Sequence, residues 1–428
     1  MVVSVEAINH FLMADPTPLD VIKDLDAQQT LNAIEELLGI TPIFITEPRL
    51  PQLHGLLAAL YAERFIAFFD MRMGKTKLAL DWASQLALAG WWDKGKGLII
   101  VPSPILLDVW KNQAKLHSVL SITCVGTKLA DFDAALKDSS DLIVISWSGL
   151  QAMFSDKNKG RKGDTTRKLM PDELHERAKL IKLAIIDEIH ACKNPQSLRF
   201  AIGQDLLAQA QFRMGLTGTP WGRNPMDAWA QSYLIDAGEA LSDNYRFFES
   251  AFGKKQVIKG APKWAQLYVF DRKKLPILQR KLSGMSMSYR RADRDQGVYQ
   301  SSVKLTMRGD QAEAYKNIMD SIADVDLGDR KKIENTFVRL RQISSGFHPF
   351  IDDYGQERVT EFKSNAKMEW LTNFAIEMGP DLKCIFFHEF IKTGMLIGRT
   401  LTRAKVSHTF LNGATADKPE AVRRFMSG

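Results

Sequence analysis

The stretch "DMRMGKTKLALDW" contains Gly74, Lys75 and Thr76, which match the last three positions of the phosphate-binding pattern G-x-x-x-x-G-K-[ST]. In such a loop the lysine reaches the outer phosphates, the threonine hydroxyl holds Mg²⁺, and the following helix N-terminus favours anions. The first glycine of the pattern is missing, because Phe69 occupies its position. By the triplet alone, the stretch is either a nucleotide site or a chance match.

A second stretch, "LAIIDEIHACKNPQS", supplies the carboxylates that phosphoryl transfer requires. Asp187 ends an apolar run, as expected of a metal-directed carboxylate, and Glu188 follows, suited to orient or deprotonate a water. A solvent-exposed Asp-Glu pair at a strand end is the alternative. His190 has no second His or Cys at ligand spacing, so a metal site there is not expected. In the third stretch, "GLTGTPWGRNP", Gly218 suits a tight turn whose threonine hydroxyls could bond the Asp-Glu pair or phosphates.

Alternating apolar and helix-length segments must position these residues. Short continuous apolar runs, each followed by a helical pattern, read as parallel strands buried on both faces. The fold class is therefore α/β, a sheet covered by helices on both sides. The expected strands are "FIAFF" (65–69), "GLIIVP" (97–102), "DLIVIS" (141–146), "LAIID" (183–187) and "FRMGLTGTP" (212–220), and a second set is "VKLTM" (303–307), "KCIFFHEF" (383–390) and "VSHTFLNG" (406–413).

The chain of 428 residues is too long for one ordinary core. The pattern divides it into an N-terminal helical segment (1–48), a first α/β lobe (49–225), a helical insertion or connector (226–300) and a second α/β lobe (301–428). The three cysteines of the chain are far apart and form no CxxC pair, which argues against a disulfide framework and a zinc site. The sequence shows neither a secretory signal nor an apolar run of the roughly 20 residues that cross a bilayer. We therefore expect a soluble, intracellular protein, and its net charge of +7 is compatible with a polyanionic partner.

The order "GKT", then "DEIH" followed by "KN", then "LTGTP" resembles superfamily-two helicases and, within them, the Swi/Snf-type DNA translocases. The resemblance covers about residues 48–428 and implies two RecA-like lobes in a compact phage or bacterial member. Further matching segments are "RLPQLHGLLAAL", "VPSPILLDVW", "VISWSGL", "SYRRADRD", "DQAEAYKNI", "LRQISSGFHP", "KCIFFHEF" and "FLNGATADKPEAVRRF".

The resemblance implies ATP and Mg²⁺ as cofactors and assigns the residues that use them. The implied ATP-binding residues are Gln52, Met73, Gly74, Lys75, Thr76 and Lys77, with Thr76 and Asp187 holding Mg²⁺. The implied catalytic residues are Lys75, Asp187, Glu188 and His190, where Glu188 positions the water and His190 couples the nucleotide state to the lobe. Arg72 replaces an earlier glycine of the family, and we expect it to face solvent or a protein carboxylate, with a nucleotide contact as the alternative.

The implied partner is DNA, duplex rather than single-stranded, held mainly by its phosphates. RNA is less expected, no membrane partner is expected, and protein partners are left open. We expect a monomer in the bacterial or phage-infected cytoplasm. Trp147 fits a packed core as well as a DNA contact, and the basic loop at 155–173 fits a solvated loop as well as a backbone grip. The candidate DNA-binding residues are Ser103, Lys111, Ser146, Trp147, Lys193, Arg290 and Arg341.

These features predict an ATP-dependent double-stranded DNA translocase in recombination, replication or repair. In the family, the second lobe continues with a Gly-rich segment and an element whose arginines reach the γ-phosphate. The sequence ends at "VRRFMSG", before either, so we expect an incomplete second lobe, a C-terminally truncated chain and impaired hydrolysis. The alternatives are a strand-separating or fork-remodelling helicase, and a nucleotide-gated DNA-binding protein without turnover.

Overall fold

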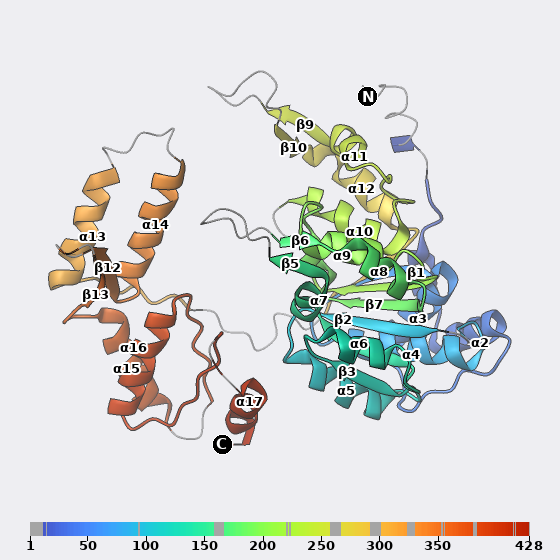
Figure 1. Cartoon of the computed structure of the whole chain (residues 1–428), viewed down its shortest axis with the longest axis horizontal. Coiled ribbons are helices and arrows are strands. Elements are labelled where there is room, and N and C mark those ends of the chain that lie inside the picture. The colour runs from blue at the N-terminus through green and yellow to red at the C-terminus, as the bar shows by residue number, and fades with distance from the viewer. Residues whose placement is uncertain are drawn as a thin grey trace. The chain divides into compact units, whose positions relative to one another are not determined.

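The protein is described by a computed structural model over residues 12–13, 15–92, 95–157, 167–219, 221, 224–256, 267–291, 301–322, 330–351, 354, 356–379, 383–413, 415 and 417–427. The chain divides into two compact units, residues 1–296 and 297–428. Each unit is described by itself (Figure 1). None of the helices in the described residues is long and apolar enough to cross a membrane.

The first unit is built on a seven-stranded sheet in the order β11-β1-β8-β7-β2-β4-β3, and every strand pair in it is parallel. This confirms the predicted α/β class, and the five strands expected in this region all form. Two further strands, β3 and β11, were not predicted. The strands are β1 Arg64–Phe69, β2 Lys96–Val101, β3 Ile122–Val125, β4 Leu142–Ser146, β7 Ile181–Asp187, β8 Phe212–Thr217 and β11 Ser286–Tyr289.

Helices cover both faces of this sheet (Figure 1). The central strands bury side chains on both sides, because alternate residues of β2 belong to different cores: Leu98 and Ile100 to one, Ile99 and Val101 to the other. Continuous apolar runs are therefore required, as the sequence has them. The helices of the unit are α2 Ala27–Leu38, α3 Leu50–Ala62, α4 Lys75–Leu88, α5 Leu106–His117, α6 Leu129–Ala135, α7 Trp147–Phe154, α8 Pro171–Ala178, α9 Leu198–Leu206, α10 Ala228–Asp236, α11 Tyr245–Phe252 and α12 Leu275–Leu282.

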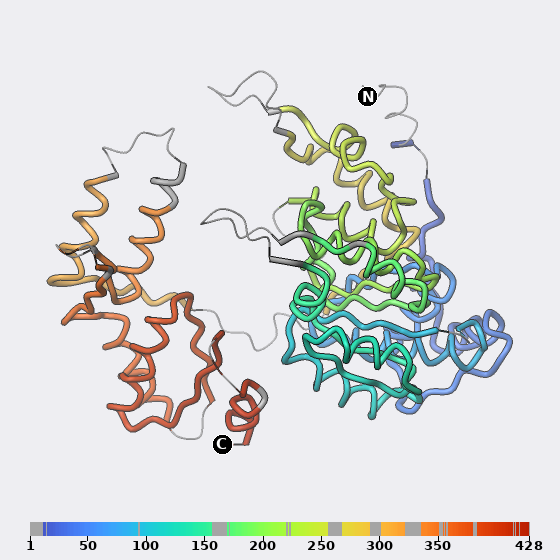
Figure 2. Tube along the Cα trace, viewed as in Figure 1, coloured from blue at the N-terminus to red at the C-terminus, as the bar shows by residue number. Residues whose placement is uncertain are grey.

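The N-terminal segment packs onto the end of the same unit. The 3₁₀ helix η1 (Leu19–Asp24) precedes α2, and the backbone N–H of Leu19 donates to Ser283 O at 2.9 Å, just before β11. This part of the trace is blue in Figure 2 and runs along the first unit. Helix α2 ends at Leu38 and is capped by Gly39, whose φ of 68° lies in the left-handed region. Residues expected as a separate connector thus contribute β11 to the first sheet.

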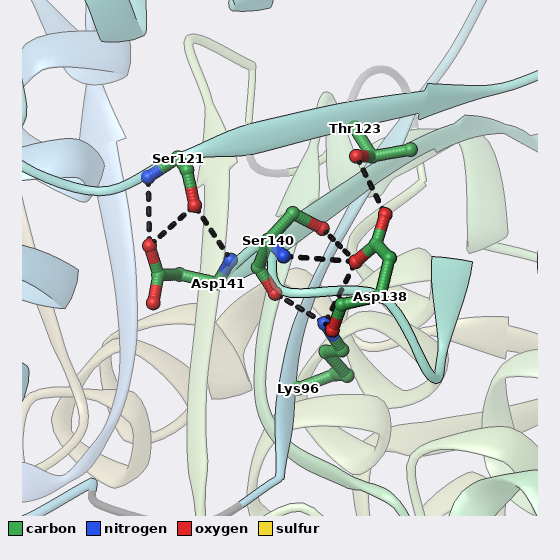
Figure 3. A network of polar contacts seen from close by, with 6 residues as sticks. All are labelled: Lys96, Ser121, Thr123, Asp138, Ser140 and Asp141. Atoms are coloured by element: carbon green, nitrogen blue, oxygen red, sulfur yellow. Dashed lines mark hydrogen bonds and ion pairs between the residues drawn. The ribbon is translucent and has the colours of Figure 1, made fainter. Parts of the chain in front are cut away.

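A polar network ties the amino ends of β2, β3 and β4 together (Figure 3). Lys96, 8% exposed, reaches Asp138 with an Nζ–Oδ1 distance of 2.9 Å, and Thr123 Oγ1 donates to Asp138 Oδ2 at 3.0 Å. Desolvation opposes ionisation of Asp138, but hydrogen bonds from Ser140, Lys96 and Thr123 outweigh it and hold its pKa well below the usual range. The network fixes the edge of the sheet opposite to the predicted site.

Two small antiparallel hairpins extend from the first unit (Figure 1). One pairs β5 (Ser155–Lys157) with β6 (Arg167–Leu169), at the two ends of the predicted basic loop, whose residues 158–166 lie outside the described part. The other pairs β9 (Gly253–Gln256) with β10 (Leu267–Phe270) and leads into the 3₁₀ helix η4 (Arg272–Lys274).

The second unit combines helices with one antiparallel hairpin, β12 (Phe347–Ile351) with β13 (Glu357–Glu361). The three strands expected here do not form: among the described residues, 303–307, 383–390 and 406–413 pair with no neighbouring strand. Without a neighbour, their apolar side chains stay accessible, and Phe387 is 94% exposed. The helices are α13 Gly309–Ile322, α14 Arg330–Ser344, α15 Ala366–Met378, α16 Ile391–Arg403 and α17 Lys418–Ser427.

Candidate nucleotide site

The phosphate loop lies between the end of β1 and the start of α4. Gly74 is the N-cap of α4 and adopts a left-handed φ of 79°, a conformation that glycine takes without strain. The side chain of Lys75 folds back over the loop, where its Nζ donates to Phe69 O at 3.0 Å. The N-terminus of α4 and the Lys75 ammonium therefore converge on the place where the sequence predicted a phosphate chain.

Arg72, two residues before Gly74, has a backbone conformation that glycine adopts more readily than other residues. Its φ is 66°, in the left-handed region that is costly for a side chain with a Cβ. The side chain is exposed, and Arg72 O accepts from the Arg49 guanidinium at 3.3 Å. The altered loop therefore keeps the turn of a glycine loop and directs the extra charge to solvent.

Gln52, near the start of α3, is held against this loop. It is 3% exposed, its Nε2 donates to Gly74 O at 3.1 Å, and its Oε1 accepts from Arg49 N at 2.8 Å. A Cβ added at Gly74 would lie only 2.2 Å from Gln52 Nε2. The Gln52 amide therefore fills the space in which a side chain at position 74 would lie.

A cavity of about 380 Å³ opens beside these residues. Its lining contains Gln52, Gly74, Thr76 and Lys77 of the predicted site together with residues that were not predicted: Thr46, Glu47, Arg49, Gln113 and His117. A hollow of about 430 Å³ between Ala237 and Phe247 contains none of the predicted residues, so the phosphate-loop cavity is the one that fits the chemistry.

Lys77 lines this cavity, and its ammonium group forms an ion pair with Asp81. Its Nζ lies 2.6 Å from Asp81 Oδ2, and both side chains are under 10% exposed. Burial raises the pKa of Asp81 to about 6, against the opposing effect of Lys77. Met73 contributes backbone, since its N–H donates to Asp70 O at 3.3 Å.

Asp187 is at the carboxyl end of β7, as predicted. Trp110 on α5, 1% exposed, donates its indole N–H to Asp187 Oδ2 at 3.0 Å and so orients the carboxylate. Burial raises the pKa of Asp187 and the neighbouring Glu188 adds to this, although Trp110 and Lys75 act in the opposite direction. A half-buried carboxylate whose charge is only partly compensated fits a cation beside it.

Glu188, His190 and Thr217 form a connected group. Glu188 has a left-handed φ of 48°, a strained conformation for a residue with a side chain. His190 Nδ1 lies 3.1 Å from Glu188 Oε2 and 3.0 Å from Thr217 Oγ1, while Thr217 Oγ1 donates to Glu188 Oε2 at 3.4 Å. The threonine of the third sequence stretch therefore does bond the Asp-Glu segment.

The end of β8 also borders the phosphate loop. Gly218 follows Thr217, and a Cβ added there would lie 3.3 Å from Phe69 O and 3.7 Å from Lys75 Nζ. Strand β8 lies between β1 and β7 in the sheet, so its end bridges the two halves of the site. The three sequence stretches meet at one edge of the sheet, as ligand sites in open α/β sheets do.

Strand β11 attaches the following chain to the same loop. Asp70 N donates to Tyr289 O at 3.0 Å, and Arg291 N donates to Asp70 Oδ2 at 3.1 Å. The hydroxyl of Tyr289 hydrogen-bonds His54 Nδ1 on α3, two residues after Gln52. Burial raises the pKa of Tyr289 to about 12, so it stays a neutral phenol.

The predicted DNA contacts differ in how accessible they are. Ser146 is 2% exposed and caps α7, accepting from Gly149 N at 3.1 Å, and Trp147 is fully buried in the core. Trp147 thus takes the packed-core alternative, and the helix that starts at the end of β4 covers Ser146. The exposed candidates are Lys111, Lys193, Arg290 and Arg341, and Ser103 is half-buried. Lys193 Nζ lies 3.6 Å from Asp227 Oδ2, and the Arg341 guanidinium forms an ion pair with Glu389.

The chain is similar to known proteins both in sequence and in fold. Residues 21–346 match the family model described as SNF2-related domain. Two solved structures are similar: the Sulfolobus solfataricus SWI2/SNF2 ATPase core in complex with dsDNA, at 20% identity over 90% of this chain and 76% of that chain with a TM-score of 0.43, and the UvsW helicase from Bacteriophage T4, at 15% identity over 55% and 66% with a TM-score of 0.31. No curated protein matches the sequence. Because the family model spans well over half of its length, the chain belongs to the SNF2-related domain family.

Proposed function

We propose that this chain is an ATP-dependent motor on double-stranded DNA, a translocase that serves recombination, replication or repair. The bridge formed by the end of β8 carries the proposal: Thr217 contacts Glu188 and His190, while Gly218 borders Lys75. A single strand end thus connects the phosphate loop with the acidic pair, which is what a site sensitive to the state of a γ-phosphate needs. Membership of the SNF2-related family supports ATP as the nucleotide.

Each residue of the site has a role that follows from its place. Lys75 and the N-terminus of α4 would bind the outer phosphates, and Gln52 and the cavity beside it would take the nucleoside. Thr76 and Asp187 would hold Mg²⁺, which neutralises phosphate charge when bound. Glu188 would orient the attacking water and accept its proton, with His190 and Thr217 fixing the carboxylate.

We assign the ATP-binding lobe to residues 49–225 and extend it by β11, with residues 301–428 as the second lobe. The sequence candidates that are exposed or half-buried, Ser103, Lys111, Lys193, Arg290 and Arg341, remain our proposed contacts to the DNA backbone. Ser146 and Trp147 are excluded from this set by their burial.

ATP turnover by the full chain tests the proposal, measured without nucleic acid and with duplex DNA, single-stranded DNA and RNA. We expect duplex DNA to stimulate turnover most, Lys75→Ala to abolish nucleotide binding, and Glu188→Gln to keep binding but lose turnover. Lys137→Ala, an exposed change after α6 and outside the cavity lining, is the matched control.

Other outcomes distinguish the alternatives. Separation of a tailed duplex would make the protein a strand-separating helicase. Nucleotide binding that Lys75→Ala abolishes, without turnover under any condition, would make it a nucleotide-gated binding protein. Stimulation by RNA above that by duplex DNA would overturn the assignment of the substrate.

A further inference from the structure

One segment of this chain carries a high net positive charge. Residues 253–274 contain six lysines and one arginine against one aspartate, a net charge of +6 in a chain whose total is +7. This segment is not among the motifs of the nucleotide site. Like charges at such density repel one another and lower the stability of the folded state unless a polyanion neutralises them.

The fold presents this charge on a defined scaffold. The hairpin of β9 and β10 pairs Lys254 with Val269 and Lys255 with Tyr268. Its base is fixed to α11, because Phe270 is 5% exposed and stacks on Phe252 with a centroid distance of 6.3 Å. The 3₁₀ helix η4 then adds its cations directly after β10.

Four of these cationic side chains are accessible to solvent and form no ion pair with a described carboxylate. Lys254, Lys255, Arg272 and Lys273 are exposed, and within the described residues no carboxylate lies within ion-pair distance of any of them. The one acid of the segment, Asp271, caps η4 by accepting from Lys273 N at 3.2 Å. Lys274 differs from the four, because its Nζ donates to Ala251 O and anchors the helix.

We propose that the β9–β10 hairpin with η4, through Lys254, Lys255, Arg272 and Lys273, is a binding surface for the phosphate backbone of nucleic acid. The surface is separate from the strand-end contacts above, and the inference rests on the proposed function for its partner. Four exposed cations, two on the hairpin and two on the 3₁₀ helix that follows it, suit a polymer with a charge every 3.4 Å along each strand. An anionic membrane fits less well, since Val269, 40% exposed, is the one large apolar side chain that the described part of the hairpin exposes.

The test is the salt dependence of DNA binding by the full chain, measured by fluorescence anisotropy with a mixed-sequence duplex and a single strand. We expect the triple variant Lys254→Ala/Lys255→Ala/Lys273→Ala to lower the slope of log K against log salt by about 2.7 on duplex DNA, at about 0.9 for each phosphate contact. A matched triple, Lys115→Ala/Lys137→Ala/Lys179→Ala, removes the same charge from exposed sites that precede β3, β4 and β7, at the opposite edge of the sheet. It should keep the wild-type slope.

Binding of a fluorescent ATP analogue, measured on the same samples, separates this inference from the proposed function. Failure of the wild-type chain to bind the analogue would refute the nucleotide site. Equal slopes of log K against log salt for the two triple variants would refute the hairpin surface. Binding to phosphatidylserine vesicles that is lost in the hairpin variant, with an unchanged DNA slope, would also overturn the proposal and assign the surface to membranes.

Discussion

Replacing Gly74 with alanine tests whether the phosphate loop and the Gln52 side chain hold each other in place. Two costs add in this variant. The backbone at φ 79° strains any residue with a Cβ by roughly 1–2 kcal/mol. The new Cβ would also lie 2.2 Å from Gln52 Nε2, so the side chain must move and lose its bonds to Gly74 O and Arg49 N.

The second cost can be sized from those two hydrogen bonds. At about 0.5–1.5 kcal/mol each, their loss adds about 1–3 kcal/mol, so Gly74→Ala should lower the free energy of unfolding by roughly 2–5 kcal/mol. Gly39→Ala is the matched control: its φ is 68°, but a Cβ there meets nothing within 4 Å. It should cost only the backbone strain, roughly 1–2 kcal/mol.

Urea denaturation followed by tryptophan fluorescence gives the free energies, and the cycle with Gln52→Ala isolates the coupling. In the Gln52→Ala background, Gly74→Ala should cost no more than Gly39→Ala does. Binding of a fluorescent ATP analogue should weaken in Gly74→Ala and stay unchanged in Gly39→Ala. Equal destabilisation by the two alanines, together with zero coupling between positions 52 and 74, would refute the packing on which this reasoning depends.

Three further predictions concern single side chains. Burial raises the pKa of Asp187, so ionisation of this carboxyl opposes folding. The stability of the wild type should therefore fall relative to that of Asp187→Asn as pH rises through the folded-state pKa. Without Mg²⁺ the variant should be the more stable of the two at neutral pH, and their stabilities should converge below about pH 3.9. The lowered pKa of Asp138 has the opposite sign: Asp138→Asn should cost about 1 kcal/mol at pH 7, and this difference should vanish as acid protonates Asp138 in the wild type. Arg72→Gly should remove a left-handed side chain and leave the free energy of unfolding equal or up to about 1 kcal/mol higher, with ATP-analogue affinity retained; a loss of affinity would show that the Arg72 side chain contacts nucleotide.

The central strands and the phosphate loop could be predicted because local pattern determines them. Buried parallel strands need continuous apolar runs, and a helix that starts at Lys75 needs a glycine turn before it. Strand β11 has only four residues, "SMSY", with no apolar run, so its place depends on pairing with β1, which the sequence does not display.

Other features depend on contacts between distant segments. Trp110 lies in an amphipathic helical stretch, and its bond to Asp187 arises only when α5 packs against β3 and β4 of the sheet. The burial of Ser146 and Trp147 reflects the way α7 starts directly at the end of β4. In the second unit, the runs at 383–390 and 406–413 have strand-like composition, but composition cannot supply the neighbouring strand that a ladder requires.

Strand β11 has a mechanical consequence for a chain that continues beyond it. Four residue pairs join it to β1 in parallel, from Ile66 with Ser286 to Phe69 with Tyr289, and Arg291 adds its bond to Asp70. A pull along the strand axis from beyond Arg291 loads these hydrogen bonds together, in shear, whereas a sideways pull would peel them one after another. Asp70 shares this load through its bonds to Tyr289 and Arg291, so tension in the chain is transmitted to the phosphate loop as well as to β1.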